Sequence, residues 1–245
     1  MKISFIVTSY NYADYILETI ESIKNQTYQE FEIIVVDDFS TDNSVEILKK
    51  VNGIKLLCHR ENKGQLAAII TGLKEANGEF VSIIDSDDTI MPEYTQTLID
   101  ELTNNNVSFV NCNNSKIQTL TPKSAPFGGW FWAPMSCSMF KKEYLNCVLD
   151  YKNTHLWKIC PDKFLFNLAH LQGNSMIIDT KLVNKREHSR NAGKIKNRLF
   201  VNIKNNFMIR QEALKILKSK VYKQIILKSY THIFRQIINF CNTKK

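Results

Sequence analysis

The sequence predicts an α/β fold, in which helices cover both faces of a mostly parallel sheet. Short runs rich in β-branched residues alternate with helical stretches over roughly the first hundred residues. This alternation is typical of right-handed βαβ units that build a parallel sheet. Three of the strand-like runs end in polar or acidic clusters. Because ligands of such sheets bind beyond the carboxyl ends of the strands, we expect a functional site along that edge.

Length and composition fit one α/β domain with a short extension. The chain has 245 residues, of which 44% are hydrophobic, enough for a sizeable core. No apolar run reaches the roughly 18 residues of a membrane span, and the N-terminus lacks the layout of a secretory signal. The six cysteines show no CxxC or zinc spacing. We therefore expect reduced thiols in a cytoplasmic protein.

The expected elements alternate regularly through the first half of the chain. Asp14 is expected to cap the first helix, and Asn77-Gly78 to end the third. The four strands are expected at residues 3–7, 31–36, 54–59 and 80–85. The helices are expected at residues 14–25, 44–50, 65–76 and from Pro92 onward.

The second half is less regular. A loop is expected at residues 112–126, and residues 127–134 form an aromatic stretch with glycine hinges. That stretch is either a wall on which a ligand stacks or a hairpin in the core, because aromatic side chains suit both. Strands are expected at residues 107–111 and 136–140, and helices from Lys141 and from Pro161 to Gly173.

An acidic run, Asp85-Ser86-Asp87-Asp88, directly follows the fourth strand. In an extended backbone residues i and i+2 point to the same side, so Asp85 and Asp87 are expected to face one point. Carboxylates at the end of a buried strand need a compensating positive charge. Mg²⁺ and Mn²⁺ prefer oxygen ligands and would suit this site. The alternative is a solvated acidic turn that caps the next helix.

Six short segments resemble those of a family 2 glycosyltransferase with a GT-A fold, in matching order and spacing. Phe39 is the visible departure, at a position where the family usually has glycine. The resemblance implies an inverting enzyme with a nucleotide-sugar donor, usually UDP-linked, and a divalent metal. The matching segments are residues 6–11, 22–27, 35–42, 61–64, 76–80 and 84–88.

The resemblance also implies roles for residues of the first half. Thr8 and Tyr10 border the nucleobase and ribose, and Asp38 accepts a hydrogen bond from the base. Asp85 contacts the ribose or a water on the metal, and Asp87 ligates Mn²⁺ or Mg²⁺. Asp88, the next acid in the run, is expected instead to cap the following helix.

Inverting transfer needs a general base, which takes the proton of the acceptor hydroxyl. In the family the base lies in an acidic motif that opens a helix after the aromatic region, and Asp162 occupies that place here. The family often has Glu-Asp where this chain has Pro161-Asp162. The alternative for Asp162 is a first-turn acid that the helix dipole favours.

Residues 185–190 resemble the basic-plus-histidine segment that closes GT-A sites. By that resemblance His188 completes the metal shell. Arg186 or Arg190 holds the diphosphate, where a planar bidentate cation suits phosphate oxygens. The alternative is a flexible basic loop.

The basic charge lies in the last part of the chain. Residues 194–245 hold 13 Lys and Arg and one acid, Glu212, a balance of +12 against −4 for the rest. We expect a catalytic domain at residues 1–193, with a donor half at 1–105 and an acceptor half at 106–193. Residues 194–245 are expected to form a basic amphipathic helical extension. It would either bind an anionic membrane surface or pack on the catalytic domain or a second subunit.

Together these features predict a metal-dependent inverting glycosyltransferase. It would move a hexosyl or N-acetylhexosaminyl group from a nucleotide-diphosphate donor to a hydroxyl of a glycan or lipid-linked saccharide, in bacterial surface polysaccharide assembly. It would act in the cytoplasm or at the inner face of the cell membrane, and nucleic acid is not an expected partner. One alternative is an inactive nucleotide-sugar-binding protein of the same fold. Another is a sugar nucleotidyltransferase, which would need a glycine-rich loop after the first strand, and residues 8–12 contain no glycine.

Overall fold

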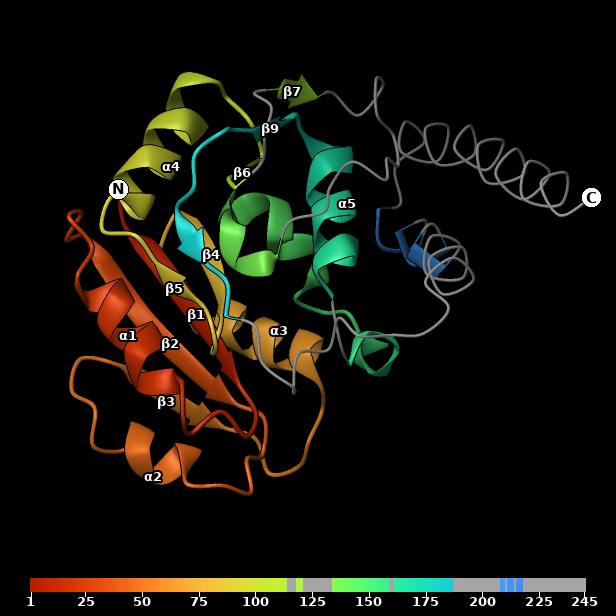
Figure 1. The fold of residues 1–245 in the computed structure, drawn as a ribbon. Coiled ribbons are helices and arrows are strands. Elements are labelled where there is room, and N and C mark those ends of the chain that lie inside the picture. Colours follow the sequence, from red (N-terminus) through yellow and green to blue (C-terminus); the bar gives the residue numbers. More distant parts are fainter. Residues whose placement is uncertain are drawn as a thin grey trace, which may run out of the picture.

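A mixed eight-stranded sheet with helices on both faces forms the body of the molecule (Figure 1). The computed structural model describes residues 1–113, 118–120, 134–158, 161–186, 208–209, 211–213 and 215–217. Within these residues the strand order is β3-β2-β1-β4-β8-β6-β9-β7, and a second, small sheet pairs β10 with β5. The predicted α/β class with a mostly parallel sheet is confirmed.

The first four strands form the parallel part of the sheet and end at one edge. In the β1–β2 pair Ser9 lies opposite Asp37, and in the β1–β4 pair Thr8 lies opposite Asp85. The polar clusters that follow these strands therefore meet at the same edge, as the sequence predicts. The strands are β1 (Ile3–Ser9), β2 (Phe31–Asp37), β3 (Lys55–Cys58) and β4 (Phe80–Asp85). The helices between them are α1 (Ile16–Lys24), α2 (Ser44–Leu48) and α3 (Gln65–Glu75).

The start of α1 differs from the prediction. The residue before the helix is Tyr15, not Asp14, and no side chain caps the helix. The turn that leads into α1 is instead held from the loop after β2, where the Asp42 carboxylate accepts the N–H of Ala13 at 3.1 Å. A contact between two loops thus replaces the local cap.

The second half adds an antiparallel strand at the centre of the sheet. β8 (Ser138–Lys141) runs antiparallel to both β4 and β6 (Phe109–Asn111). Helices α4 (Tyr94–Asn104) and α5 (Asp162–Gln172) lie where helices were predicted. The helix expected from Lys141 is a 3-10 helix, η2, which begins at Lys142.

Four short strands were not predicted, because each has only two or three residues and so shows no periodicity. Two further 3-10 helices, η1 (Met135–Cys137) and η3 (Thr154–Trp157), flank the η2 helix (Lys142–Val148). The unpredicted strands are β5 (Thr89–Ile90), β7 (Gln118–Leu120), β9 (Ser175–Ile177) and β10 (Val183–Asn184).

Two apolar layers cover the two faces of the sheet. Phe5 and Val7 of β1 enter the layer formed with α1 and α4, whereas Ile6 enters the layer formed with α3 and α5. All three side chains are fully buried. Burial on both faces is the expected environment of a central strand in a covered parallel sheet.

Part of the C-terminal segment packs onto the second of these layers. Ile209, Ala213 and Leu217 recur at helical spacing, are buried, and join the apolar cluster that contains Trp157 and Phe164. For the described residues between 208 and 217, packing on the α/β domain is therefore the arrangement that the structure shows. The amphipathic pattern expected after residue 220 lies outside the described residues.

Glu212 anchors this helical turn. Its carboxylate is 4% exposed and accepts hydrogen bonds from the hydroxyl of Tyr151 at 2.9 Å and the amide of Asn153 at 3.2 Å. Lys215 also donates to it, at 2.6 Å. The one acid of the basic segment thus serves to attach that segment to the domain.

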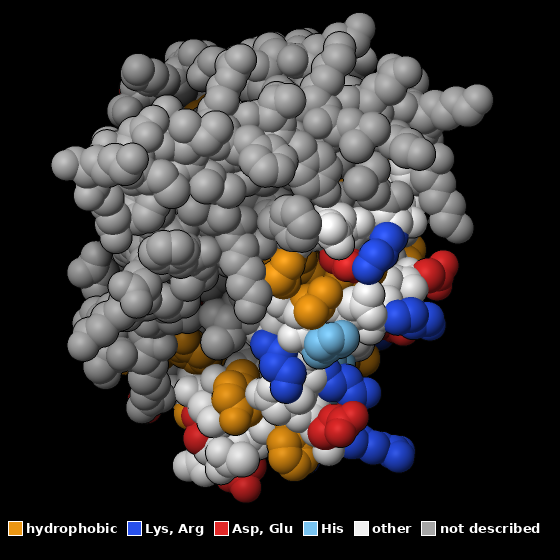
Figure 2. Space-filling model, turned by 90° about the vertical axis from the view of Figure 1, so that its right-hand side faces the viewer, with side chains coloured by type: hydrophobic (Ala, Val, Ile, Leu, Met, Phe, Trp, Pro, Cys, Tyr) orange, Lys and Arg blue, Asp and Glu red, His pale blue; other side chains and the backbone are white. Residues whose placement is uncertain are grey.

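The described part of the surface in Figure 2 carries Lys and Arg side chains interspersed with Asp, Glu and hydrophobic ones. Among the described residues no helix is long and apolar enough to cross a membrane.

The anchoring role predicts that Glu212→Ala destabilises the domain. The substitution leaves the half-buried hydroxyl of Tyr151 without its acceptor, which costs about 1 kcal/mol. Gln211→Ala, on the exposed side of the same turn, is the control and should change stability by about 0.5 kcal/mol or less. Denaturant unfolding measures both. Equal midpoints for the two variants would contradict the anchor.

Candidate active site

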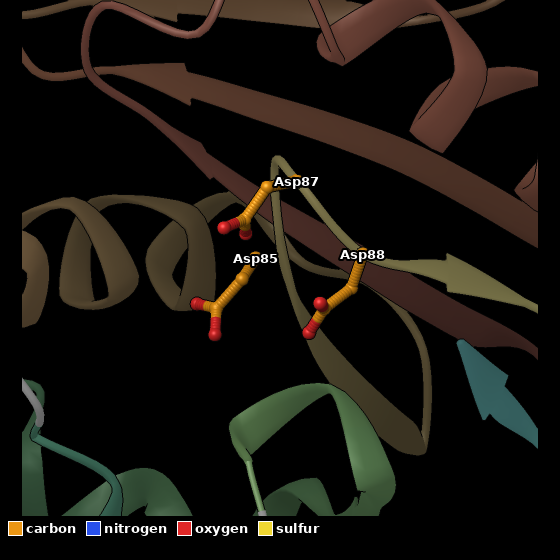
Figure 3. A group of neighbouring side chains, drawn as sticks. All are labelled: Asp85, Asp87 and Asp88. Carbon is orange, nitrogen blue, oxygen red and sulfur yellow. The ribbon is translucent and has the colours of Figure 1, made fainter. Parts of the chain in front are cut away.

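Three carboxylates converge where β4 ends. One oxygen from each of Asp85, Asp87 and Asp88 lies within 4.8 Å of the others, and Figure 3 shows the three side chains around one turn. Asp87 is 8% exposed and Asp88 is 2% exposed. The predicted approach of Asp85 to Asp87 is observed, and a third acid joins them.

The prediction that Asp88 caps the following helix is wrong. Helix α4 begins at Tyr94, and no side chain caps it. The turn after β4 leads instead into β5, whose pairing with β10 holds the acidic turn under a second strand. This pairing directs Asp88 into the carboxylate cluster.

Polar side chains from other elements fix the cluster. Gln65, the first residue of α3, donates from its amide to Asp85 at 2.7 Å. Ser136 in η1 accepts the backbone N–H of Asp85 at 3.0 Å. Ser86 turns away, as predicted, and its hydroxyl donates to the carbonyl of Thr8 at 2.6 Å. The orientation of these acids therefore depends on α3, η1 and β1 together.

The cluster carries more negative charge than its surroundings compensate. Burial, and then the charges of Asp88, Asp87 and Asp162, raise the pKa of Asp85 well above its ordinary value, while Lys185 lowers it. Burial also raises the pKa of Asp88 to about 6, against the hydrogen bond from Ser136. The raised pKa values show that this buried, acidic environment disfavours the charged form of these carboxylates.

One oxygen of this cluster also lacks a donor. Oδ2 of Asp88 is buried and has no hydrogen-bond partner among the described residues. An oxygen in that situation costs free energy unless a cation or an ordered water meets it. Three convergent carboxylates with an unsatisfied oxygen fit a hard divalent cation such as Mg²⁺ or Mn²⁺.

Asp162 lies beside this cluster although it comes from the second half of the chain. It is the first residue of α5, and its charge contributes to the raised pKa of Asp85. Burial raises the pKa of Asp162 itself, while the backbone N–H groups of Asp162 and Lys163 lower it. The site therefore combines three acids of one turn with a fourth at a helix N-terminus.

Asp38 lies at the same edge of the sheet and is held by three donors. Its carboxylate meets a ring nitrogen of His59 at 2.7 Å and accepts the N–H groups of Lys63 at 2.9 Å and Gly64 at 2.6 Å. Gly64 has a φ of 89°, and a Cβ there would come within 2.6 Å of the Cα of Lys158. Glycine is therefore required for the backbone to reach Asp38. His59 is one of the partners that orient this acid.

The other residues predicted for the nucleotide lie nearby along β1. Thr8 is near the end of this strand and is 8% exposed, whereas Tyr10, just beyond it, is 44% exposed. The register of β1 with β2 places them next to the loop that carries Asp38. A ligand at this edge would therefore meet the ring of Tyr10 at the surface.

Arg186 has a different surrounding from the one expected. Its guanidinium pairs with Glu18 and lies 4.8 Å from the centre of the Tyr15 ring, both on or beside α1. Its backbone N–H, however, bonds to the carboxylate of Asp88. His188 and Arg190 lie outside the described residues, as do residues 127–133 of the aromatic stretch.

Sequence reasoning missed Gln65, Ser136 and Lys185 as site residues. Gln65 directly follows the glycine of a segment that resembles the family, and Lys185 begins the basic segment, so both carried a positional signal. Ser136 had none, because only the packing of η1 beneath β4 brings it to the cluster.

The loop after β2 explains the departure at Phe39. Ser40 donates from its backbone and its hydroxyl to the two oxygens of Asp37, at 2.8 and 2.5 Å, and its hydroxyl accepts the N–H of Asn11 at 2.8 Å. This tight loop places Phe39 at a φ of 70°, a conformation that glycine adopts at little cost. The side chain of Phe39 is 48% exposed and so gains little from burial.

An acidic, cation-deficient site at the carboxyl ends of parallel strands defines an α/β protein suited to an anionic ligand accompanied by a metal. The comparisons with known proteins give the particular family. The model of the family described as "Glycosyl transferase family 2" matches residues 4–217. The chain belongs to glycosyltransferase family 2.

Two curated relatives match part of the chain. Glycosyltransferase GlyG of Streptococcus pneumoniae is 44% identical over 105 residues, or 41% of this chain. The UDP-Glc:alpha-D-GlcNAc-diphosphoundecaprenol beta-1,3-glucosyltransferase WfaP of Escherichia coli is 40% identical over 88 residues, or 35% of this chain. The matched region spans 35% of the length of each relative.

Solved structures match over nearly the whole chain and confirm the fold. TarS of S. aureus, residues 1–349, has a TM-score of 0.68 at 23% identity and covers 92% of this chain and 69% of its own. The mannosyltransferase PcManGT of Pyrobaculum calidifontis, solved with GDP-Man and Mn²⁺, has a TM-score of 0.61 at 20% identity. It covers 94% of this chain and 69% of its own.

The conformation of Phe39 predicts that Phe39→Gly is more stable than Phe39→Ala. Both variants lose the same exposed ring, but only glycine adopts a φ of 70° without strain, a difference of about 1 kcal/mol. Denaturant unfolding of the two variants measures it. A more stable alanine variant would show that the loop relaxes to another conformation.

Proposed function

We propose that this chain transfers a sugar, with inversion, from a UDP-linked donor to a hydroxyl of a glycan or lipid-linked saccharide, with Mn²⁺ or Mg²⁺. One observation carries the proposal. Asp85, Asp87 and Asp88 converge in one turn at the carboxyl end of a parallel strand, and the charge of Asp162, from a separate part of the chain, contributes to the raised pKa of Asp85. The names of similar proteins support it, since TarS was solved with UDP-GlcNAc and WfaP is named for UDP-Glc and a diphosphoundecaprenol-linked sugar.

On the donor side, Thr8, Tyr10 and Asp38 border the nucleobase and ribose, and Asp85 contacts the ribose. Asp38 is oriented in advance by His59 and by the N–H groups of the loop before α3. Preorganisation of this kind lowers the entropic cost of binding. The exposed ring of Tyr10 offers a face on which a base can stack.

Asp87 and Asp88 would hold the metal, with His188 as a further ligand. A bound divalent cation would act as a Lewis acid and stabilise the charge that develops on the leaving diphosphate. The unsatisfied oxygen of Asp88 and the raised pKa of Asp85 support this assignment, because both would be relieved by a cation.

Asp162 is the proposed general base. It takes the proton of the acceptor hydroxyl as that oxygen forms a bond to the anomeric carbon. The bond from this carbon to the diphosphate breaks, and its electron pair leaves with the diphosphate. Burial raises the pKa of Asp162, which brings its basicity closer to that of an effective base at neutral pH.

The proposal predicts that Asp87→Asn abolishes metal-dependent release of nucleotide. Wild-type protein is screened with UDP-, GDP- and dTDP-sugars and a panel of acceptors, with and without Mn²⁺. Loss of a charged ligand should lower turnover by about 10²-fold or more. Asp100→Asn, an exposed acid on α4, is the control and should keep wild-type turnover. Undiminished, still metal-dependent turnover in Asp87→Asn would remove the metal assignment.

The base assignment predicts that Asp162→Asn lowers kcat by about 10²–10⁴-fold. The affinity for the nucleotide should change little, because the base contacts the acceptor. Steady-state kinetics and calorimetric titration with the nucleoside diphosphate separate the two effects. A collapse of nucleotide affinity instead would make Asp162 a donor-binding residue.

For the last part of the chain we propose contact with an anionic membrane surface. Residues 218–245 hold seven Lys and Arg and no acid, and each such residue contributes about 1 kcal/mol near an anionic leaflet. Truncation after Leu217 is the suitable test, because it keeps the buried Ile209, Ala213 and Leu217. Full-length protein should sediment with anionic liposomes but not neutral ones, less at high salt, and the truncated protein should stay in solution. Equal sedimentation of both proteins would exclude residues 218–245 as the contact.

A further inference from the structure

The 3-10 helix η3 contacts both of the helices whose first residues enter the candidate site. Helix α3 begins at Gln65, and α5 begins at Asp162. Trp157, the last residue of η3, stacks on α5, and the next residue, Lys158, bonds to the N-terminus of α3. Two consecutive residues therefore connect the helix that carries the proposed base with the loop that holds the proposed donor-binding acids.

An aromatic stack fixes η3 against α5. The indole of Trp157 lies nearly parallel to the ring of Phe164, with 4.6 Å between the ring centres and 12° between the ring planes. Both side chains are buried, and Phe164 lies in the first turn of α5, two residues after Asp162. Because buried aromatic pairs prefer a restricted set of geometries, the stack fixes the end of η3 relative to the start of α5.

A chain of hydrogen bonds also holds the indole nitrogen. Nε1 of Trp157 donates to the hydroxyl of Tyr151 at 3.1 Å, and this hydroxyl donates to the carboxylate of Glu212 at 2.9 Å. The ring of Tyr151 packs against Phe164 as well, with 5.3 Å between the ring centres. The indole N–H is the one hydrogen-bond donor of a tryptophan side chain. Trp157 thus has both its ring and its donor engaged, which defines its position.

The backbone of Lys158 contacts the residues that orient the donor-binding acids. Its carbonyl accepts the N–H of Gln65 at 2.9 Å, and a Cβ at Gly64 would come within 2.6 Å of its Cα. Gly64 in turn donates its N–H to Asp38 at 2.6 Å, and Gln65 donates its side-chain amide to Asp85 at 2.7 Å. A shift of Lys158 would therefore displace a hydrogen-bond donor of each acid.

We propose that Trp157 is a positioning residue for the transfer reaction. It fixes the two donor-binding acids relative to the proposed base, Asp162, and acts through its neighbours without contact to a substrate. The inference rests on the proposed function, because this spacing matters to turnover only if donor and acceptor react between these acids. A misplacement of about 1 Å can lower the rate of such a reaction by about 10²-fold.

Hydrogen exchange of the folded protein tests the connection without any substrate. Trp157→Leu removes the stack and the hydrogen bond, so the amides of residues 63–65 should exchange about tenfold faster than in wild-type protein. Trp157→Phe keeps a ring against Phe164 and should accelerate the same exchange by about threefold. If Trp157→Leu does not fold, the milder variant makes the comparison.

Phe166→Leu is the matched control, because it removes a stacked ring from the same helix and the same apolar layer. Phe166 stacks with Phe109 and Phe140 of the sheet, with 5.4 and 5.6 Å between the ring centres. The control should lower the free energy of unfolding. It should leave the exchange of residues 63–65 unchanged at low denaturant, where amides exchange by local opening.

Ligand binding and turnover give a second readout, which a merely structural role would not move. UDP, GDP and dTDP are titrated calorimetrically in the presence of Mn²⁺. Trp157→Leu should bind the tightest of them about threefold more weakly or worse, because the acids are less well preorganised. Its kcat should fall by about tenfold or more, with Trp157→Phe between it and wild-type protein. Phe166→Leu should keep wild-type values. Asp162→Asn, by contrast, is expected to lower kcat alone.

The two readouts separate the two hypotheses. If wild-type protein binds none of the three nucleotides, the proposed function fails, and hydrogen exchange still tests the connection through Trp157. If residues 63–65 exchange at the wild-type rate in the Trp157 variants, or equally fast in Phe166→Leu, the positioning role is overturned. Faster exchange in Trp157→Leu with unchanged nucleotide affinity and unchanged kcat overturns it as well.

Discussion

The structure depends on the electrostatic cost of holding several carboxylates together at the edge of a sheet. Asp85, Asp87 and Asp88 lie within a few ångströms of one another and are largely removed from solvent. Such an arrangement is unfavourable by itself, as the raised pKa values of Asp85 and Asp88 show. The strands, α3 and η1 fix the backbone around it. A bound cation would remove the cost, so a ligand that brings positive charge would stabilise the site.

The N-terminus of α3 connects two acids of the candidate site, Asp38 and Asp85. Gly64 donates its N–H to Asp38, and the neighbouring residue, Gln65, donates its side-chain amide to Asp85. The backbone N–H of Gln65 bonds to the carbonyl of Lys158 at 2.9 Å, directly after η3. These residues thus link Asp38, the acid proposed to contact the nucleobase, with Asp85, the acid proposed to contact the ribose. They also link both acids to η3. Trp157 of η3 donates to the hydroxyl of Tyr151 at 3.1 Å, the same hydroxyl that binds Glu212.

The departures from the family pattern have different consequences. Phe39 occupies a loop position that favours glycine, but it lies at the surface, so the cost falls on stability rather than on the arrangement of the acids. Pro161 stands where the family often has an acid. Because proline is well tolerated at the start of a helix, α5 still begins at Asp162. Arg186 packs against Tyr15 beside α1. Lys185 is therefore the described cation whose charge lowers the pKa of Asp85.

The sequence by itself determined the parallel half of the sheet and the convergence of its acids. The segments of β1, β2 and β4 are rich in β-branched residues and alternate with helices, and both are local properties of the sequence. Parallel strands follow from this pattern, and the carboxyl ends of parallel strands lie at one edge of the sheet. The tertiary structure decided the rest. Asp88 joins the cluster because β5 pairs with β10, a contact between residues far apart in the chain that no local pattern encodes. The same holds for Ser136, Lys185 and the approach of Asp162 to Asp85. Short strands form only where a partner is present, and side chains from separate elements meet only after the whole sheet has assembled.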